Sequence, residues 1–196
     1  MKIKIYAISV CFIMLLSAMI LPVSSVEALD DPVTFEFELV KGWNVISIPV
    51  EHELNASDLA LIIDNCTDIS KWNSSSQSYE GYLIQMSEQD FEIEPGMGLY
   101  VHVNNETSFN LTGELVQNIE LELLPGYNLI GWHKQESVPA SILFESIDNC
   151  TKIMYEKGTE PEKYVYDGVE NVTDFIIEQG MGFFVDVDNL SIYDFS

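Results

Sequence analysis

The chain has 196 residues, and its 32 acidic residues against 8 basic ones give a formal net charge of −24 at pH 7. A field of that sign repels phosphate backbones, which excludes nucleic acid as a partner. The content of hydrophobic residues, 47%, is too high for a disordered acidic tail. Such acidity suits a salty medium, a surface rich in divalent cations, or a cationic partner.

The N-terminus has the pattern of a secretory signal peptide. A lysine-containing start, residues 1–4, precedes an apolar run over residues 5–21, and Ala28 is the small residue before the predicted cleavage. The run falls short of the roughly 18–20 residues that a spanning helix needs, although an uncleaved anchor helix is the alternative. We therefore expect residues 1–28 to be removed, leaving a mature chain without a membrane span. The loss of two lysines and one glutamate would change the formal charge to −25.

The rest of the sequence is duplicated with an offset of 84 residues. The block Ile63–Thr67 recurs letter for letter as Ile147–Thr151. Residues 33–112 align without a gap with residues 117–196, and about a third of the aligned residues are identical. We expect two pseudo-symmetric repeats, residues 29–116 and 117–196. Each element predicted below for the first repeat recurs 84 positions later.

Strands dominate the predicted content of each repeat. Residues 34–39 alternate polar and apolar side chains, which is typical of a half-buried strand. A type II turn with Gly42 at positive φ would lead into a second strand over residues 43–50, paired antiparallel with the first. The glycines of Gly96-Met97-Gly98 permit a tight turn or a close backbone approach before a strand over residues 99–103.

One helix per repeat follows from the spacing of apolar residues. Four of them recur at i, i+3, i+7 and i+10, which places them on one stripe of an α-helix with a cysteine near its C-terminus. These residues are Ala56, Leu59, Ile63 and Cys66. Two short strands, 68–72 and 79–84, then flank a polar loop, and a last strand follows the turn at Asn104-Asn105. With about six strands and one helix per repeat, the predicted class is α+β with a strong β bias.

Two segments of the first repeat carry a resemblance to a known family. Residues 41–50, Lys-Gly-Trp-Asn-Val-Ile-Ser-Ile-Pro-Val, and residues 94–103 resemble the "GWNLISIP … GxGYWVxV" repeat. That repeat occurs in tandem in archaeal and bacterial extracellular and surface-layer-associated proteins. The resemblance implies a secreted or envelope-associated module without an assigned reaction. The second repeat departs from the pattern, because Tyr127 replaces Trp43 and Gly-Trp-His over residues 131–133 replaces Ser-Ile-Pro.

Glycosylation acceptors and cysteines are consistent with export. Eight N-x-[ST] triplets behind a signal peptide predict a secreted glycoprotein. The acceptor asparagines are Asn55, Asn65, Asn73, Asn105, Asn110, Asn149, Asn171 and Asn189. Cys66 and Cys150 occupy equivalent positions, and an oxidising compartment would allow a disulfide between them, which we expect. A buried free cysteine that acts as a small hydrophobe is the alternative.

Candidate metal and catalytic residues are few. The three histidines, His52, His102 and His133, sit at unrelated places in the repeat and do not suggest a metal centre. Calcium is the one cofactor for which the sequence offers a weak candidate site, with hard oxygen donors near a turn at Asp186, Asp188 and Asn189. Acids also match between the repeats beside the Gly-Met-Gly turn. These matched pairs are Asp90 with Asp174 and Glu94 with Glu178.

Aromatic residues around one hairpin are the candidates for ligand binding. Trp72 and Tyr79 flank this hairpin, and exposed aromatic rings on a β-surface can stack on sugar rings. Glu156 replaces Trp72 in the second repeat, which indicates a position outside the core, whereas Tyr82 is expected to pack inside.

Three classes of function follow from these features. The favoured class is a secreted, N-glycosylated, non-enzymatic module at the cell surface, with a structural or surface-binding role toward an envelope protein or glycan. A carbohydrate-binding accessory protein is the second class. A glycosidase that uses paired carboxylates is the third.

Overall fold

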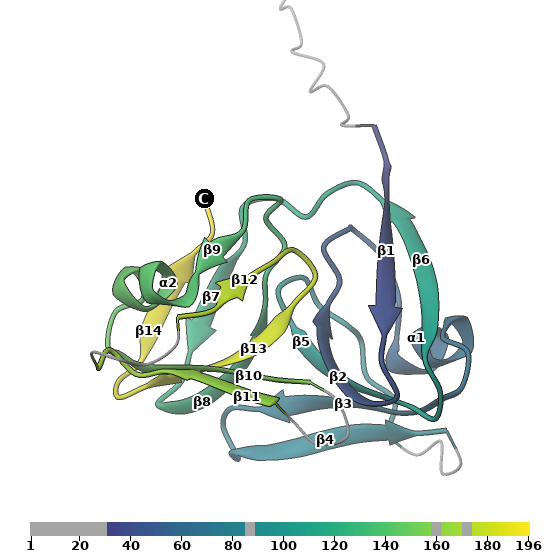
Figure 1. Cartoon of the computed structure of the whole chain (residues 1–196), viewed down its shortest axis with the longest axis horizontal. Coiled ribbons are helices and arrows are strands. Elements are labelled where there is room, and N and C mark those ends of the chain that lie inside the picture. Colours follow the sequence, from purple (N-terminus) through teal and green to yellow (C-terminus); the bar gives the residue numbers. More distant parts are fainter. Residues whose placement is uncertain (1–30, 85–88, 158–161, 170–173) are drawn as a thin grey trace, which may run out of the picture.

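A computed structural model describes residues 31–84, 89–157, 162–169 and 174–196, and that part of the chain contains fourteen strands and two short helices (Figure 1). The predicted signal peptide lies outside the described residues. The strands of residues 33–113 are β1 (Val33–Leu39), β2 (Gly42–Ser47), β3 (Cys66–Asn73), β4 (Ser78–Leu83), β5 (Gly98–Val103) and β6 (Thr107–Gly113). Those of residues 117–196 are β7 (Glu120–Leu123), β8 (Gly126–Gly131), β9 (Val138–Pro139), β10 (Cys150–Lys157), β11 (Glu162–Tyr166), β12 (Ile176–Ile177), β13 (Gly182–Val187) and β14 (Ser191–Asp194). The helices are α1 (Ala56–Ile62) and α2 (Ala140–Ser146), so the class is the predicted β-rich α+β.

Two four-stranded antiparallel sheets form the frame of the molecule. Their strand orders are β2-β5-β3-β4 and β8-β13-β10-β11, and three two-stranded sheets accompany them: β1-β6, β7-β14 and β9-β12. In the first four-stranded sheet Gly42 pairs with Val103, and in the second Gly126 pairs with Val187. We call residues 33–113 the first half and residues 117–196 the second half, and the residue 84 positions later the counterpart.

The predicted hairpin between the first two strands is wrong. β1 pairs with β6, and β2 pairs with β5, so the two strands belong to different sheets. The buried side chain of Asn44 explains the corner between them. Its Oδ1 accepts a hydrogen bond from the Val40 N–H at 2.9 Å, and its Nδ2 donates to the Val40 carbonyl at 2.8 Å. Because this amide satisfies the backbone at Val40, the chain can leave β1 without hairpin pairing.

The predicted helix is shorter than the apolar stripe suggested. α1 ends at Ile62, and Cys66 lies in strand β3 instead of on the helix. Asn65 adopts φ 60°, a left-handed conformation that asparagine tolerates and that cannot continue an α-helix. Its counterpart Asn149 has φ 59°. The stripe therefore combines about two turns of helix with the first residue of a strand, both facing the same core.

Buried side chains form three cores. The first lies between α1 and the inner face of β3 and β5, and the second holds the counterpart elements of the second half. A small third core, which we call the junction core, lies between the halves and consists of two counterpart pairs. These are Val45 with Leu129 and Tyr100 with Phe184.

Backbone hydrogen bonds join the two Gly-Met-Gly turns to the opposite half. The glycines permit the close backbone approach that the sequence predicted. The Ser47 N–H donates to the Gly180 carbonyl at 2.8 Å, and the counterpart Gly131 N–H donates to the Gly96 carbonyl at 2.8 Å. A Cβ atom on Gly98 would lie 2.7 Å from the Ile130 carbonyl oxygen, too close for any side chain without backbone movement. The halves therefore meet backbone to backbone at these turns.

The predicted disulfide is not formed. Cys66 and Cys150 are both free thiols. Cys66 belongs to the first core, and Cys150 packs against the second. Each cysteine follows its helix, and Figure 1 shows α1 and α2 on opposite flanks of the molecule. The halves touch at the Gly-Met-Gly turns instead of at the helix C-termini, so the thiols lie apart, and burial raises the pKa of each to about 11.

Candidate functional site

Aromatic rings from four strands form a continuous row on the face of the first sheet that also contributes to the junction core. Trp43 of β2 contacts Tyr100 of β5 with ring centroids 6.0 Å apart, and Tyr100 contacts Tyr79 of β4 at 5.3 Å. Tyr79 in turn contacts Trp72 of β3 at 4.8 Å. All three contacts are edge-to-face, the arrangement that aromatic pairs prefer. We call Trp43, Tyr100, Tyr79 and Trp72 the aromatic strip.

The strip presents two rings to solvent. Trp43 is 39% exposed and Tyr79 is 54% exposed, whereas Tyr100 between them is buried. Polar side chains lie beside Trp43, because His102 of β5 is its cross-strand partner. The ring of His102 lies 4.9 Å from that of Trp43, and its Nδ1 is 2.7 Å from the Thr67 hydroxyl. Exposed rings beside fixed polar groups are the elements of a surface that binds a ligand with both apolar and hydroxyl faces.

Trp72 is half-buried at the junction. The sequence had indicated a position outside the core, because Glu156 replaces Trp72 in the second half. Its Nε1–H donates to the Tyr127 carbonyl at 2.7 Å, and its ring lies 5.3 Å from that of Phe184. Tyr79 is therefore the more accessible of the two predicted sugar-stacking residues. Trp72 serves mainly to hold the halves together.

Tyr100 links the strip to the second half. Its hydroxyl donates to Glu156 Oε2 over a long 3.4 Å contact. Burial is the main cause that raises the pKa of Tyr100, and the neighbouring Tyr79 hydroxyl and the charge of Glu156 raise it further. The Tyr100 hydroxyl therefore stays protonated. The hydroxyl is a fixed donor, with no tendency to act as a base at neutral pH.

One matched pair of acids, Asp90 and Asp174, stabilises helix N-termini. Asp90 accepts hydrogen bonds from the Ser57 N–H at 3.0 Å and the Ser57 hydroxyl at 2.6 Å, and Asp174 accepts the same two bonds from Ser141 at the same distances. Slight desolvation would raise the pKa of Asp90, but its bonds from Ser57 and Phe91 lower it below the usual range. These carboxylates complete the first turns of α1 and α2. Their matching between the halves thus has a structural explanation.

The calcium candidates lie at the end of β13 and in the turn that follows it. Asp186 lies in β13 opposite Lys152 of β10, whereas Asp188 and Asn189 follow the strand in an exposed turn. Within residues 31–84, 89–157, 162–169 and 174–196, no group of three or more His, Cys, Asp or Glu side chains is arranged to hold a metal ion. Lys152 beside Asp186 would also compete with a cation for that carboxylate.

Most of the predicted glycosylation sites lie on the surface. Six acceptor side chains are exposed: Asn55, Asn65, Asn105, Asn110, Asn149 and Asn189. Asn73 is half-buried, and its amide is engaged, because Nδ2 donates to Glu80 Oε1 at 2.6 Å. Asn171 lies outside the described residues. Among the six exposed acceptors, Asn149 Nδ2 donates to Ser191 Oγ at 3.1 Å and Asn105 Nδ2 donates to Asn65 Oδ1 at 3.4 Å.

The three histidines lie apart, and the sequence did not indicate the burial of one of them, His133. His133, which has Pro49 as its counterpart, is only 4% exposed and packs against Phe195 with ring centroids 4.6 Å apart. It lines a cavity of about 330 Å³ beside Gln135 and Glu136. Burial, and secondarily the charge of Lys134, lower the pKa of His133 to about 4. The replacement of a proline by histidine within a copied segment was the signal that pointed to it.

Comparison of the chain with protein-family models, with curated proteins and with solved structures gives no match. No helix in the described part of the chain is long and apolar enough to cross a membrane. The aromatic strip combines two exposed rings with neighbouring polar side chains. Trp43 and Tyr100, which the sequence did not single out, belong to it together with Tyr79 and Trp72.

Proposed function

We propose that the protein is a non-enzymatic binding module of the cell envelope, secreted and N-glycosylated, made of two pseudo-symmetric copies that share one junction. The two copies are supported by the strand registers, because each main pair of the first half recurs 84 residues later. Six exposed acceptor asparagines support glycosylation. The single observation that carries a binding role is the pair of exposed rings, Trp43 and Tyr79, on one sheet face with Tyr100 between them.

A carbohydrate is the ligand class that the strip favours. Sugar rings offer apolar C–H faces and hydroxyl rims, and the strip offers aromatic faces flanked by the polar His102 and Thr67. If the ligand is a glycan of the cell envelope, the protein would be both a surface-binding module and a carbohydrate-binding protein. Of the matched acids that the glycosidase alternative could use, Asp90 and Asp174 are hydrogen-bonded at helix termini.

Affinity electrophoresis of the glycosylated protein through gels that contain envelope polysaccharides would test this function. We expect retarded migration of the wild type and at least tenfold weaker binding of the Trp43→Ala/Tyr79→Ala double variant, a change of about 1.4 kcal/mol. Ile192→Ala is the matched control, since Ile192 is a similarly exposed apolar residue on β14. Retardation that is equal in all three proteins would rule out the strip as the binding surface.

A further inference from the structure

The first half closes one backbone edge with its own chain. Val50, just beyond β2, forms an antiparallel bridge with Leu115. The bridge has two backbone hydrogen bonds, from the Glu51 N–H at 2.7 Å and from the Val116 N–H at 3.0 Å. Leu115 packs against the first core, and Val116 is buried. An extended apolar segment thus lies along the edge that continues β2.

The second half presents the same edge without such a segment among the described residues. Lys134 is the counterpart of Val50, and no strand of the described chain pairs with it. The Gln135 N–H, the counterpart of the donor on Glu51, makes no hydrogen bond to a described residue. The His133 carbonyl accepts one bond, from Gln179 Nε2 at 2.9 Å, and a carbonyl oxygen has a second lone pair to offer.

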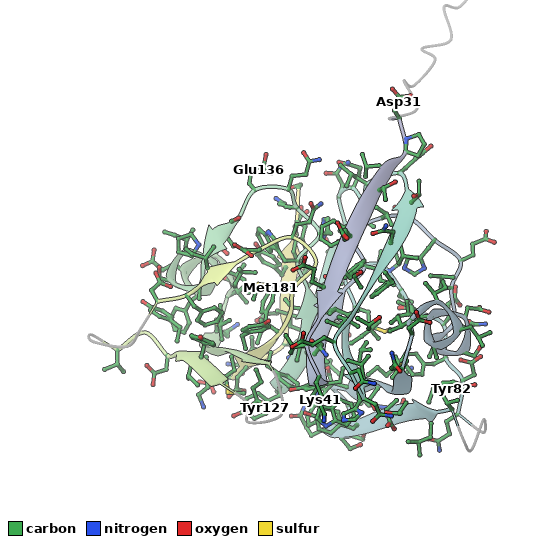
Figure 2. The ribbon with its side chains drawn as sticks, turned by 45° about the vertical axis from the view of Figure 1, so that its right-hand side comes forward. Asp31, Lys41, Tyr82, Tyr127, Glu136 and Met181 are labelled. Atoms are coloured by element: carbon green, nitrogen blue, oxygen red, sulfur yellow. The ribbon has the colours of Figure 1, made fainter. Side chains whose placement is uncertain are left out.

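A cavity lies along this edge. Its volume of about 330 Å³ is within the roughly 300–1,000 Å³ of typical ligand sites, and Leu115 and Phe195 give it apolar walls. The His133 ring lines it, and although the residue is only 4% exposed, its Nδ1 has no partner among the described residues. Buried polar nitrogens are nearly always hydrogen-bonded, so this one indicates that a polar group belongs beside it. Figure 2 shows Glu136, at the mouth of this region, at the opposite end of the molecule from Tyr127.

We propose that the backbone edge His133–Gln135 binds an extended segment of a partner polypeptide by strand addition, in the manner in which Glu114–Val116 occupies the edge of Val50. The segment would donate a backbone N–H to the His133 carbonyl, accept from the Gln135 N–H, and place a polar group near His133 Nδ1.

The first half also defines the residues that the segment needs. Gly113 precedes the bridging residues, and a Cβ there would lie 2.5 Å from the Glu51 carbonyl oxygen, so a glycine is required at that position. Two apolar residues follow one position later. The lining of the cavity carries one cation, Lys134, and one acid, Glu136, so charge contributes little to the choice. The partner is therefore recognised by a Gly-x-apolar-apolar sequence in extended conformation.

Binding of a labelled peptide to the full-length protein would test the proposal. The peptide Gly-Glu-Leu-Val-Gln-Asn has the sequence of residues 113–118, and its binding is followed by fluorescence anisotropy. We expect saturable binding that weakens at least tenfold when proline replaces the valine, because proline removes the N–H that would meet the His133 carbonyl. On the protein side, Gln135→Pro should weaken binding at least tenfold, while Ile192→Ala leaves it unchanged.

A second readout uses the wild-type protein alone and does not depend on the folding of a variant. We expect the imidazole ¹⁵N resonances of His133 to shift on addition of the peptide, with those of His52 unchanged. No binding at millimolar peptide, or equal binding of the proline peptide, would overturn the proposal. A concentration-dependent dimer that Gln135→Pro abolishes would make a second copy the occupant and would overturn the assignment to a partner chain.

Discussion

Tyr127 and Trp43 stand at counterpart positions on two edge strands, β8 and β2, yet their surroundings differ. The backbone of Tyr127 is held from the first half. Its carbonyl accepts from Trp72 Nε1 and from Gln77 Nε2, and its N–H donates to Gln77 Oε1. Trp43 has no such side-chain partners for its backbone among the described residues, and its ring is 39% exposed.

This difference shows how two halves with matching strand registers have unequal edge strands. The strand registers of the halves come from positions that are alike in both, such as Asn44 and Asn128, which fold the same corner. The side-chain contacts to the Tyr127 backbone come from positions that differ, because Trp72 and Gln77 have Glu156 and Pro161 as counterparts in the sequence. One edge strand is thereby protected, and the other carries an exposed tryptophan.

The largest expected effect comes from breaking the junction core at its centre. Phe184 is buried among Tyr100, Trp72 and Tyr127, with ring centroids 5.3 to 6.1 Å away. Phe184→Ala should therefore lower the free energy of unfolding by about 3–5 kcal/mol. Tyr100→Phe removes only a hydroxyl with a 3.4 Å contact and should cost less than about 1 kcal/mol. Urea denaturation measures both, and similar costs for the two would mean that the junction core does not stabilise the fold.

The second prediction concerns acid stability, which should involve the second half more than the first. Burial lowers the pKa of His133 from 6.5 to about 4, so the imidazole stays neutral in the folded protein while the unfolded chain takes up a proton below pH 6.5. The unfolded state then binds more protons, and stability is lost as the pH falls from about 6.5 to 4, by at most about 3 kcal/mol. The first half has Pro49 at this position, although burial also lowers the pKa of its own His52, which contributes in the same direction.

Denaturation at pH 7 and at pH 4.5 of the wild type and of His133→Gln isolates this effect, since the carboxylates titrate in both proteins. We expect the variant to lose less stability over this range than the wild type. Equal losses would show that His133 protonates without cost in the folded state.

The third prediction compares the glycines of the two Gly-Met-Gly turns. A Cβ on Gly98 would lie 2.7 Å from the Ile130 carbonyl oxygen, and one on Gly182 would lie 2.6 Å from the Ile46 carbonyl oxygen. Because both obstacles are backbone atoms, Gly98→Ala and Gly182→Ala should each cost about 1–3 kcal/mol. Gly81→Ala is the control, since its Cβ would meet only the Ser70 hydroxyl, which can rotate. Thermal unfolding measures all three, and a Gly81 cost equal to the others would argue against a tight junction.

The sequence predicted local elements better than their partners. The strand over residues 99–103 and the hairpin around residues 73–78 were correct because their β-formers and turn residues act over short distances. The pairing of β1 was wrong, because the Asn44 amide takes the place of hairpin bonds and this contact is not visible in a pattern of polar and apolar residues.

The candidate site was predicted in part, for a related reason. Trp72 and Tyr79 were singled out correctly as neighbours, since they pair directly across one hairpin. Trp43 and Tyr100 joined them only through the order of strands in the sheet, which brings β2 beside β5 and β5 beside β3. The predicted disulfide was wrong for the same reason, because equivalent sequence positions do not reveal where the two halves touch.

The smallest expected effect addresses the contrast between Tyr127 and Trp43 most directly. The Gln77 amide accepts from the Tyr127 N–H at 2.9 Å and donates to its carbonyl at 3.0 Å, and so imitates a neighbouring strand for one residue. Gln77→Ala should lower the free energy of unfolding by about 1 kcal/mol, because each exchanged hydrogen bond contributes little in net terms. The sharper measurement is hydrogen exchange of the Tyr127 amide, which we expect to be protected in the wild type and fast in the variant. Ser76→Ala, in the same loop with a hydroxyl bonded only to Ser78, should leave that exchange rate unchanged. If the Tyr127 amide exchanges equally slowly without the glutamine side chain, the edge of β8 is protected by Trp72 packing alone, and the amide contact is incidental.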